Sequence, residues 1–305
     1  MASILRAGVI GAGVFGAHHA GCYASAPGVR LCAVIDTHAD RASALSARFG
    51  AVAYDDLAQF LAAVDLVSIA SPATAHAPAA LACLRAGKAI YVEKPIATTL
   101  EDADAIAAEA AGRSLVVACG FLERAAFEVM GLFDIPQAPL RMEATRLGPA
   151  SPRNLDVSVV ADLMIHDLDL ALCLSRGAPL AVEAQGTCET HSLLDTAEAE
   201  VNFDDGFTAL LTASRVANDR RRTMRLVYPS GDLTIDFLSH SFVNATGFAL
   251  NEDYGETPAG KDRLGASIGA FLAAVRGDAP RPLADEIDGA RALDLALAVE
   301  QAIGR

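Results

Sequence analysis

Five short segments in the first 120 residues are almost continuously apolar, and stretches with helical periodicity separate them. Such alternation predicts βαβ units and a parallel sheet whose strands are buried on both faces. The expected strands are 6–10, 29–35, 66–70, 88–92 and 115–119, and the expected helices are 14–25, 39–49, 55–62, 78–86 and 100–111. Thr99 is the expected N-cap of the last of these helices.

After Gly120 the hydrophobic period shortens to two, which indicates antiparallel strands. Hairpin turns are expected at residues 204–206 and 229–232, where Gly follows Asp or Ser. The expected strands are 140–147, 182–189, 197–203, 207–215, 223–228 and 232–237, and the expected helices are 160–174, 262–276 and 284–303. The pattern therefore predicts a doubly wound parallel α/β domain over residues 1–120. A C-terminal α+β domain with a largely antiparallel sheet follows over residues 121–305, and its last helix can pack back on the first domain.

Composition narrows the class of protein. A chain of 305 residues suits two domains, and 52% hydrophobic with 20% charged residues is a globular composition. The net charge of −14 disfavours a nucleic-acid partner, and the run Arg220–Arg222 is expected to be a solvated loop. No apolar stretch approaches the about 20 residues of a membrane span, and no secretory signal is evident. Six cysteines without paired spacing indicate a reducing compartment, so we expect a cytoplasmic protein that does not associate with membranes.

The segment 11–16 reads GAGVFG and lies between an expected strand and an expected helix. In that context the glycines permit a tight turn, close approach of a pyrophosphate and close helix packing, as in a Rossmann domain. Asp36 ends the next strand, twenty residues past Gly16, where a carboxylate accepts hydrogen bonds from a ribose 2′-hydroxyl and repels a 2′-phosphate. NAD is therefore the expected cofactor. The expected contacts at this turn are Gly11, Gly13, Val14, Phe15 and Gly16.

Two further loops follow expected strands and so face the same edge of the sheet, where ligands bind in open α/β folds. The first holds Ser71 and Thr74, which are expected to contact phosphate or ribose, and His76. His76 is a candidate cofactor contact, although we favour an exposed residue at a helix N-terminus. The second loop holds Glu93 and Lys94, both candidate cofactor contacts.

Lysine is rare in this chain: three lysines stand against twenty-one arginines. Lys94 directly follows an expected central strand, where an ammonium can hydrogen-bond an alcohol oxygen. A partly buried lysine can also take part in proton transfer, which arginine cannot. Lys94 is therefore a catalytic candidate, with a plain surface lysine as the alternative.

Asp162 and His166 are four residues apart in the expected helix 160–174 and so share one face. The carboxylate can orient the ring, and histidine is suited to general-base catalysis near neutrality. One alternative is a pair without function. Another is a divalent metal bound by Asp162, His166 and Asp169, which lacks a further ligand from elsewhere. We therefore expect no metal.

These motifs together resemble the Gfo/Idh/MocA oxidoreductases over nearly the whole chain. The resemblance rests on the glycine motif with Asp36, the Ser-Pro-x-x-x-His loop, Glu93-Lys94-Pro95 and Asp162-x-x-x-His166-Asp. It implies a Rossmann domain followed by an open-faced domain whose sheet often mediates oligomerisation, so a homo-oligomer is expected. It also implies that Lys94, Asp162 and His166 serve NAD(P)-linked oxidation of a sugar or cyclitol.

The string from Arg146 to Leu163 is similar to a narrower branch of this family, which oxidises UDP-N-acetylglucosamine at the 3-hydroxyl. A diphosphate bound by so acidic a protein requires local arginines, and Arg124, Arg146 and Arg153 are the candidates. The alternative interpretation is that these three arginines are ordinary surface charges. The alternative functions are a dehydrogenase of a free sugar or inositol and a non-catalytic NAD-binding regulator.

Overall fold

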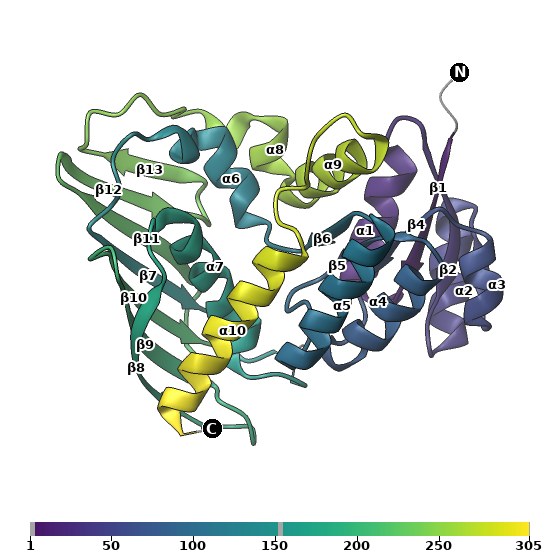
Figure 1. The fold of residues 1–305 in the computed structure, drawn as a ribbon, viewed down its shortest axis with the longest axis horizontal. Helices are drawn as coiled ribbons and strands as arrows, with labels where there is room; N and C mark the ends of the chain where they lie inside the picture. The colour runs from purple at the N-terminus through teal and green to yellow at the C-terminus, as the bar shows by residue number, and fades with distance from the viewer. Residues whose placement is uncertain (1–3, 152–154, 305) are drawn as a thin grey trace. The chain divides into compact units, whose positions relative to one another are not determined.

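Six parallel strands form the first sheet, in the order β3-β2-β1-β4-β5-β6. This is the strand order of a dinucleotide-binding Rossmann fold, as expected. The structure, a computed structural model, describes residues 4–151 and 155–304, which divide into two units (Figure 1). The strands of unit 1 are β1 (Leu5–Ile10), β2 (Val29–Ile35), β3 (Val52–Tyr54), β4 (Leu66–Ile69), β5 (Ala89–Val92) and β6 (Val117–Cys119).

Helices α1, α2 and α9 share one hydrophobic cluster with the strands of this sheet. Leu264, Ile268 and Phe271 of α9 pack there with Tyr23 of α1, so unit 1 comprises the described residues of Met1–Leu122 together with Leu264–Ala290. The sequence placed all residues after 120 in the second domain. The helices are α1 (Val14–Ser25), α2 (Ala39–Phe49), α3 (Leu57–Ala62), α4 (His76–Arg85), α5 (Leu100–Arg113) and α9 (Arg263–Arg276).

Seven strands form the sheet of unit 2, in the order β13-β12-β11-β7-β10-β9-β8. Neighbouring strands are antiparallel except β7 and β10, which are parallel. Figure 1 shows α6 and α7 on one face of this sheet. The strands are β7 (Arg141–Leu147), β8 (Pro179–Thr187), β9 (Thr196–Phe203), β10 (Thr208–Ser214), β11 (Arg221–Tyr228), β12 (Gly231–Asp236) and β13 (Ser241–Asn244).

The helices of unit 2 begin with α6 (Glu123–Met130). A π-helical turn, η3 (Val160–Met164), leads into α7 (Ile165–Leu174), and the short α8 (Pro258–Lys261) follows the last strand. α10 (Glu286–Ile303) closes the chain, and its residues from Arg291 onward belong to unit 2. No helix of the described chain is both long and apolar enough to cross a membrane.

Local signals predicted most of these elements. Thr99 caps α5 as expected, because its side chain accepts a hydrogen bond from the backbone of Asp102. Both expected hairpins form, joining β9 to β10 and β11 to β12. The sequence did not predict β3 or β13, which have only three and four residues and little burial. It also missed α6, which directly follows the apolar run of β6.

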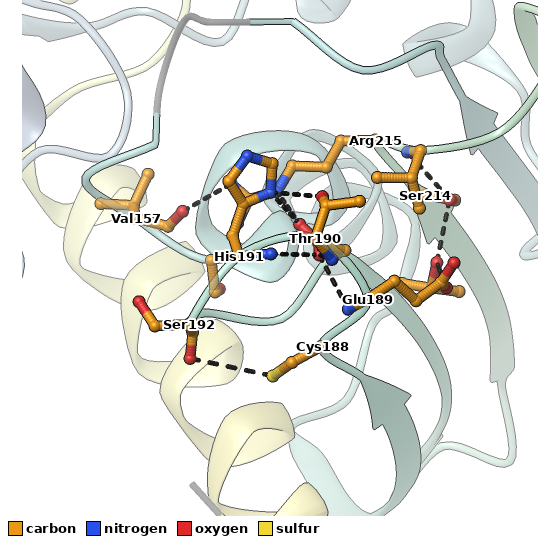
Figure 2. A network of polar contacts seen from close by, with 12 residues as sticks. Val157, Cys188, Glu189, Thr190, His191, Ser192, Ser214 and Arg215 are labelled. Atoms are coloured by element: carbon orange, nitrogen blue, oxygen red, sulfur yellow. Dashed lines mark hydrogen bonds and ion pairs between the residues drawn. The ribbon is translucent and has the colours of Figure 1, made fainter.

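Asp195, fully buried between β8 and β9, organises the preceding loop. Its Oδ2 accepts hydrogen bonds from the backbone N–H groups of Glu189, Thr190 and His191, at 2.9, 2.6 and 3.0 Å. Its Oδ1 lies 2.9 Å from Nε of Arg215 and 2.7 Å from Nδ1 of His191. Figure 2 shows Glu189, Thr190 and His191 of this loop close to Arg215.

This network also fixes the segment that enters η3. Nη1 of Arg215 donates to the carbonyl oxygen of Val157 at 2.8 Å (Figure 2). The backbone N–H of Val159 donates to Leu194 at 2.9 Å. The approach to the helix that carries Asp162 and His166 is thus held from the sheet.

Asp195→Asn should lower the free energy of unfolding by about 3–5 kcal/mol, because it removes the charge of one partner from a buried ion pair with Arg215. Asp232→Asn is the matched control, since it breaks an exposed pair with Arg225 and should change stability little. Urea unfolding followed by far-UV circular dichroism measures both, and equal stability of the two variants would contradict the assigned role.

The same carboxylate gives a pH dependence of stability. Burial tends to raise the pKa of Asp195, but its hydrogen bonds, that from the Thr190 backbone foremost, hold this pKa far below its ordinary value. A depressed folded-state pKa stabilises the fold above the unfolded pKa of about 4 and loses that effect as the pH falls further. Below about pH 4 the wild type should therefore lose stability more steeply than Asp195→Asn.

Candidate functional site

The glycine turn between β1 and α1 has the geometry that a dinucleotide requires. Gly11 has a φ of +96°, and a Cβ there would lie 2.7 Å from the backbone of Ala70. A Cβ on Gly16 would lie 1.8 Å from the carbonyl oxygen of Gly11, whereas one on Gly13 would meet no atom within 4 Å. The first and third glycines therefore serve the turn and helix packing, and Gly13 leaves open space where a pyrophosphate can approach the backbone.

Side chains at the start of α1 are exposed beside that space: Val14 by 54% and Phe15 by 40%. The N–H groups of the first helical turn lack partners within the helix and suit an anion. Ser71, in the loop after β4, has a buried Oγ without a hydrogen-bond partner in the described part of the chain. These features fit the phosphates and ribose of NAD.

Asp36 lies at the end of β2 and contacts the glycine turn. Its Oδ2 accepts a hydrogen bond from the backbone of Ala12 at 2.6 Å, and its Oδ1 one from His38 at 2.8 Å. Burial opposes these hydrogen bonds, but together with the nearby Arg41 they lower the pKa of Asp36. The carboxylate is thus charged beside the turn, where it repels a 2′-phosphate.

The expectation that His76 is exposed was wrong, because only 1% of its surface is accessible. Its Nδ1 lies 2.7 Å from the carbonyl oxygen of Pro95, and its Nε2 lies 2.9 Å from that of Ser71. Burial lowers the pKa of His76, although these two carbonyl oxygens oppose that effect. His76 therefore joins the loops after β4 and β5 from inside instead of contacting the cofactor. Thr74, in the first of these loops, is exposed.

Glu93 also faces inward, and the structure gives it an internal role instead of the expected contact. Its Oε1 lies 2.9 Å from Nε2 of His19 in α1, whose Nδ1 lies 2.9 Å from Oγ of Ser68 in β4. A Cβ on Gly120 would lie 2.9 Å from the other oxygen of Glu93, so both oxygens are enclosed. Lys94 follows directly and is half-buried. The Lys94 backbone is therefore attached to a buried anchor.

Asp162 lies in the π turn η3 and His166 in the first turn of α7. Only 7% of Asp162 is exposed, whereas His166 is half-buried. The expected helix is present, but its first turn is π-helical, a local widening that often occurs at functional sites. Oγ of Ser158 accepts hydrogen bonds from the backbone of Val160 and Ala161, which fixes the start of the turn. The same hydroxyl pairs with Glu300 of α10.

The arginines expected to bind a diphosphate have other partners. Arg146 is 2% exposed and pairs with both oxygens of Asp167, at 3.0 and 2.9 Å, and with Glu123 at 2.8 Å. Arg124 is 6% exposed and pairs with both oxygens of Asp169. Buried guanidinium groups with several carboxylate bonds cannot also take a diphosphate, so this expectation was wrong for both.

Two other predicted residues, Asp169 and Arg153, have different outcomes. Asp169, considered as a metal ligand, is bound to Arg124 in a buried bidentate ion pair. Arg153, the third expected diphosphate ligand, lies outside the described residues.

Sequence reasoning missed His19 and Ser68, because they lie inside apolar segments and their partners are far along the chain. His19 pairs with Glu93, 74 positions away, and with Ser68, 49 positions away. It also missed Glu123 as the partner of Arg146. No local signal identified it, because the helix that Glu123 begins was itself not predicted and its arginine partner lies 23 residues away.

Comparison with known families agrees with this arrangement. Residues 5–121 match the oxidoreductase family with an NAD-binding Rossmann fold known as Gfo/Idh/MocA, and residues 139–234 match the C-terminal domain of that family. The inositol 2-dehydrogenase 2 of Saccharopolyspora erythraea is 34% identical, but the match covers 55% of this chain and 52% of that protein.

Other relatives match over the full length. The UDP-N-acetylglucosamine 3-dehydrogenase of Acidithiobacillus ferrooxidans is 36% identical over 98% of this chain and 97% of its own. A solved structure of that enzyme has a TM-score of 0.90 over 99% of this chain and 98% of that one, at 35% identity. The WlbA dehydrogenase of Bordetella pertussis, solved with NADH and UDP-GlcNAcA, shares the fold, with a TM-score of 0.88 at 17% identity over 99% of this chain and 96% of that one.

The full-length match and the two family domains extend what the glycine turn and the Asp162–His166 helix indicated. The chain therefore belongs to the Gfo/Idh/MocA family of NAD-binding oxidoreductases.

Proposed function

We propose that this protein oxidises the 3-hydroxyl of UDP-N-acetylglucosamine with NAD as the hydride acceptor. The observation that carries the proposal is the 36% identity, over 98% of this chain, to an enzyme of that name. The glycine turn and Asp36 support NAD as the cofactor. Of the three motif glycines only Gly13 has free space beside it, where a pyrophosphate can approach, and the Asp36 carboxylate is hydrogen-bonded to the turn at Ala12.

The proposed chemistry assigns one task to each of three side chains. His166 takes the proton of the substrate hydroxyl, because a half-buried imidazole can reach substrate and exchange protons. Asp162 stabilises the positive charge that develops on that ring. Lys94 donates a hydrogen bond to the same substrate oxygen and stabilises its developing negative charge. NAD, when bound, accepts the hydride that leaves the carbon.

Two alternatives differ in substrate or in activity. A free sugar or inositol would suit the inositol dehydrogenase relatives, whose matches cover only about half of the chain. A non-catalytic NAD-binding regulator has no need of Lys94, Asp162 and His166 together. Mixing the protein with NAD and each sugar while following NADH absorbance separates these classes. The homo-oligomer and the cytoplasmic location remain predictions.

Lys94→Met should reduce turnover by about 10²–10⁴-fold while NAD affinity stays nearly unchanged, because the ammonium acts on the substrate oxygen. Steady-state kinetics and NAD titration measure the two effects. Lys88→Met is the matched control, because Lys88 donates to the carbonyl oxygen of Val64 outside the proposed chemistry. Near-normal activity of Lys94→Met would refute its role.

His166→Gln should lower kcat by a similar about 10²–10⁴-fold, since glutamine keeps the polarity but cannot accept the proton. The remaining activity should rise with pH, because hydroxide then replaces the missing base. If His166 and Lys94 act on the same oxygen, the double variant should lose much less than the product of the two single losses. Multiplicative losses would indicate independent roles.

Asp36→Ser should weaken NAD and improve NADP, because it removes an acceptor for the 2′-hydroxyl and the repulsion of a 2′-phosphate. The ratio of kcat/KM for the two cofactors measures the change. Asp40→Ser, at an exposed position in α2, is the control. A wild type that already prefers NADP would contradict the interpretation of Asp36.

A further inference from the structure

The basic run Arg220–Arg222 is not the solvated loop that its composition suggested. Arg222 lies in β11, directly opposite Arg146 in β7. Alternation along the strand places it on the same face as Met224 and Leu226, both fully buried. Arg222 is therefore half-buried on the face of the sheet that carries the helices, whereas Arg221 is exposed on the opposite face.

The side chain of Arg222 also lacks an acceptor among residues 4–151 and 155–304. Arg146 pairs with Asp167 and with one oxygen of Glu123, and Arg263 lies 3.7 Å from the other oxygen of Glu123. Among the arginines that the structure describes, Arg222 is the one that is not fully exposed and whose side chain has no hydrogen-bond or ion-pair partner. A partly desolvated cation without an acceptor is unfavourable, so this position calls for an anion.

The surroundings make the unpaired charge more unfavourable. Burial foremost, and then repulsion from Arg146, lower the pKa of Arg222. Attraction by Glu123 opposes them, and weaker repulsion from Arg220 and Arg263 adds to the lowering. A guanidinium stays protonated at neutral pH, so it cannot relieve this repulsion by losing a proton. Nε of Arg263 is likewise buried without an acceptor within the described residues. Arg222 and Nε of Arg263 are thus both donors without an acceptor among the described residues, and an anion would supply one.

His166 belongs to the same neighbourhood. It precedes Asp167, the partner of Arg146, in α7. Burial alone would raise the pKa of Glu123, but Arg146 foremost, and then His166 and Arg263, lower it. The proposed base and the unpaired arginine therefore lie around one buried carboxylate.

We propose that Arg222 binds the diphosphate of the nucleotide-sugar substrate, with Arg263 beside it. This inference rests on the proposed function. In UDP-N-acetylglucosamine the first phosphate is attached at C1, only two ring carbons from C3, so a group that binds it must lie near the base that acts at C3. Arginine suits phosphate oxygens because its planar fork donates two parallel hydrogen bonds.

The test titrates UDP into the NAD-saturated protein and follows the heat of binding. Arg222→Met should weaken UDP binding by about 10–100-fold, which is the effect of losing a charge-assisted contact. Arg222→Lys keeps the charge without the fork and should lose less. Arg221→Met, on the exposed face of the same strand, should bind UDP as the wild type does. Equal affinity of Arg222→Met and wild type would overturn the inference.

Thermal unfolding distinguishes a ligand-binding arginine from a structural one. Without ligand, Arg222→Met should melt at the temperature of the wild type or above it, because the change removes an unpaired cation. UDP should raise the melting temperature of the wild type more than that of the variant. A variant that melts clearly below the wild type without ligand would instead show that Arg222 supports the fold and would overturn the inference.

Kinetics separate this inference from the proposed function. With UDP-N-acetylglucosamine, Arg222→Met should raise KM with little change in kcat, as expected for a contact equal in ground and transition states. Oxidation of the UDP-sugar with an unchanged KM in the variant would refute the diphosphate contact and leave the function standing. Oxidation of inositol or free hexoses by a wild type that neither oxidises UDP-N-acetylglucosamine nor binds UDP would refute both. If glucuronate, but not UDP, raised the melting temperature of the wild type more than that of Arg222→Met, Arg222 would bind a sugar carboxylate. That result would refute the diphosphate contact.

Discussion

The second unit depends on the buried ion pairs that the guanidinium of Arg146 forms with Glu123 and Asp167. The guanidinium joins the end of β7 to the first residue of α6 through Glu123 and to the first turn of α7 through Asp167. A charge this deeply buried is tolerated only while its partners stay in place, and loss of one partner is costly. The two helices are therefore held in one position on the sheet. Because Asp167 follows His166, the same ion pair fixes the backbone of the proposed base.

Unit 1 uses neutral and singly charged hydrogen bonds for the equivalent task. His76 joins the loops after β4 and β5, and His19 joins α1 to Glu93 at the end of β5. The half-buried Lys94 stands between these two buried histidine contacts in sequence and is held by both. Side chains that act on a ligand need such support, because a small displacement of an acting group weakens its effect.

The sequence predicted the features that local backbone chemistry controls. The glycine turn, the hairpin turns and the Thr99 cap each depend on residues a few positions apart, and each was found. The predictions for His76, Arg124 and Arg146 failed because burial and partners depend on residues far along the chain. Arg146 shows this well: its partners lie 23 residues before it and 21 after it, and no local pattern reveals either. The π turn escaped prediction for a related reason, since helical periodicity does not register one widened turn.

The position of α9 has a consequence for biosynthesis. Leu264, Ile268 and Phe271 complete the hydrophobic cluster of unit 1, yet they follow the whole sheet of unit 2 in the chain. On the ribosome, the nucleotide-binding sheet is made first and must wait for most of the remaining chain before its apolar surface is covered. Such exposed surface favours aggregation and chaperone binding during synthesis. The two units therefore cannot fold strictly one after the other during synthesis. An isolated fragment that ends at residue 122 would leave exposed the apolar surface that α9 covers.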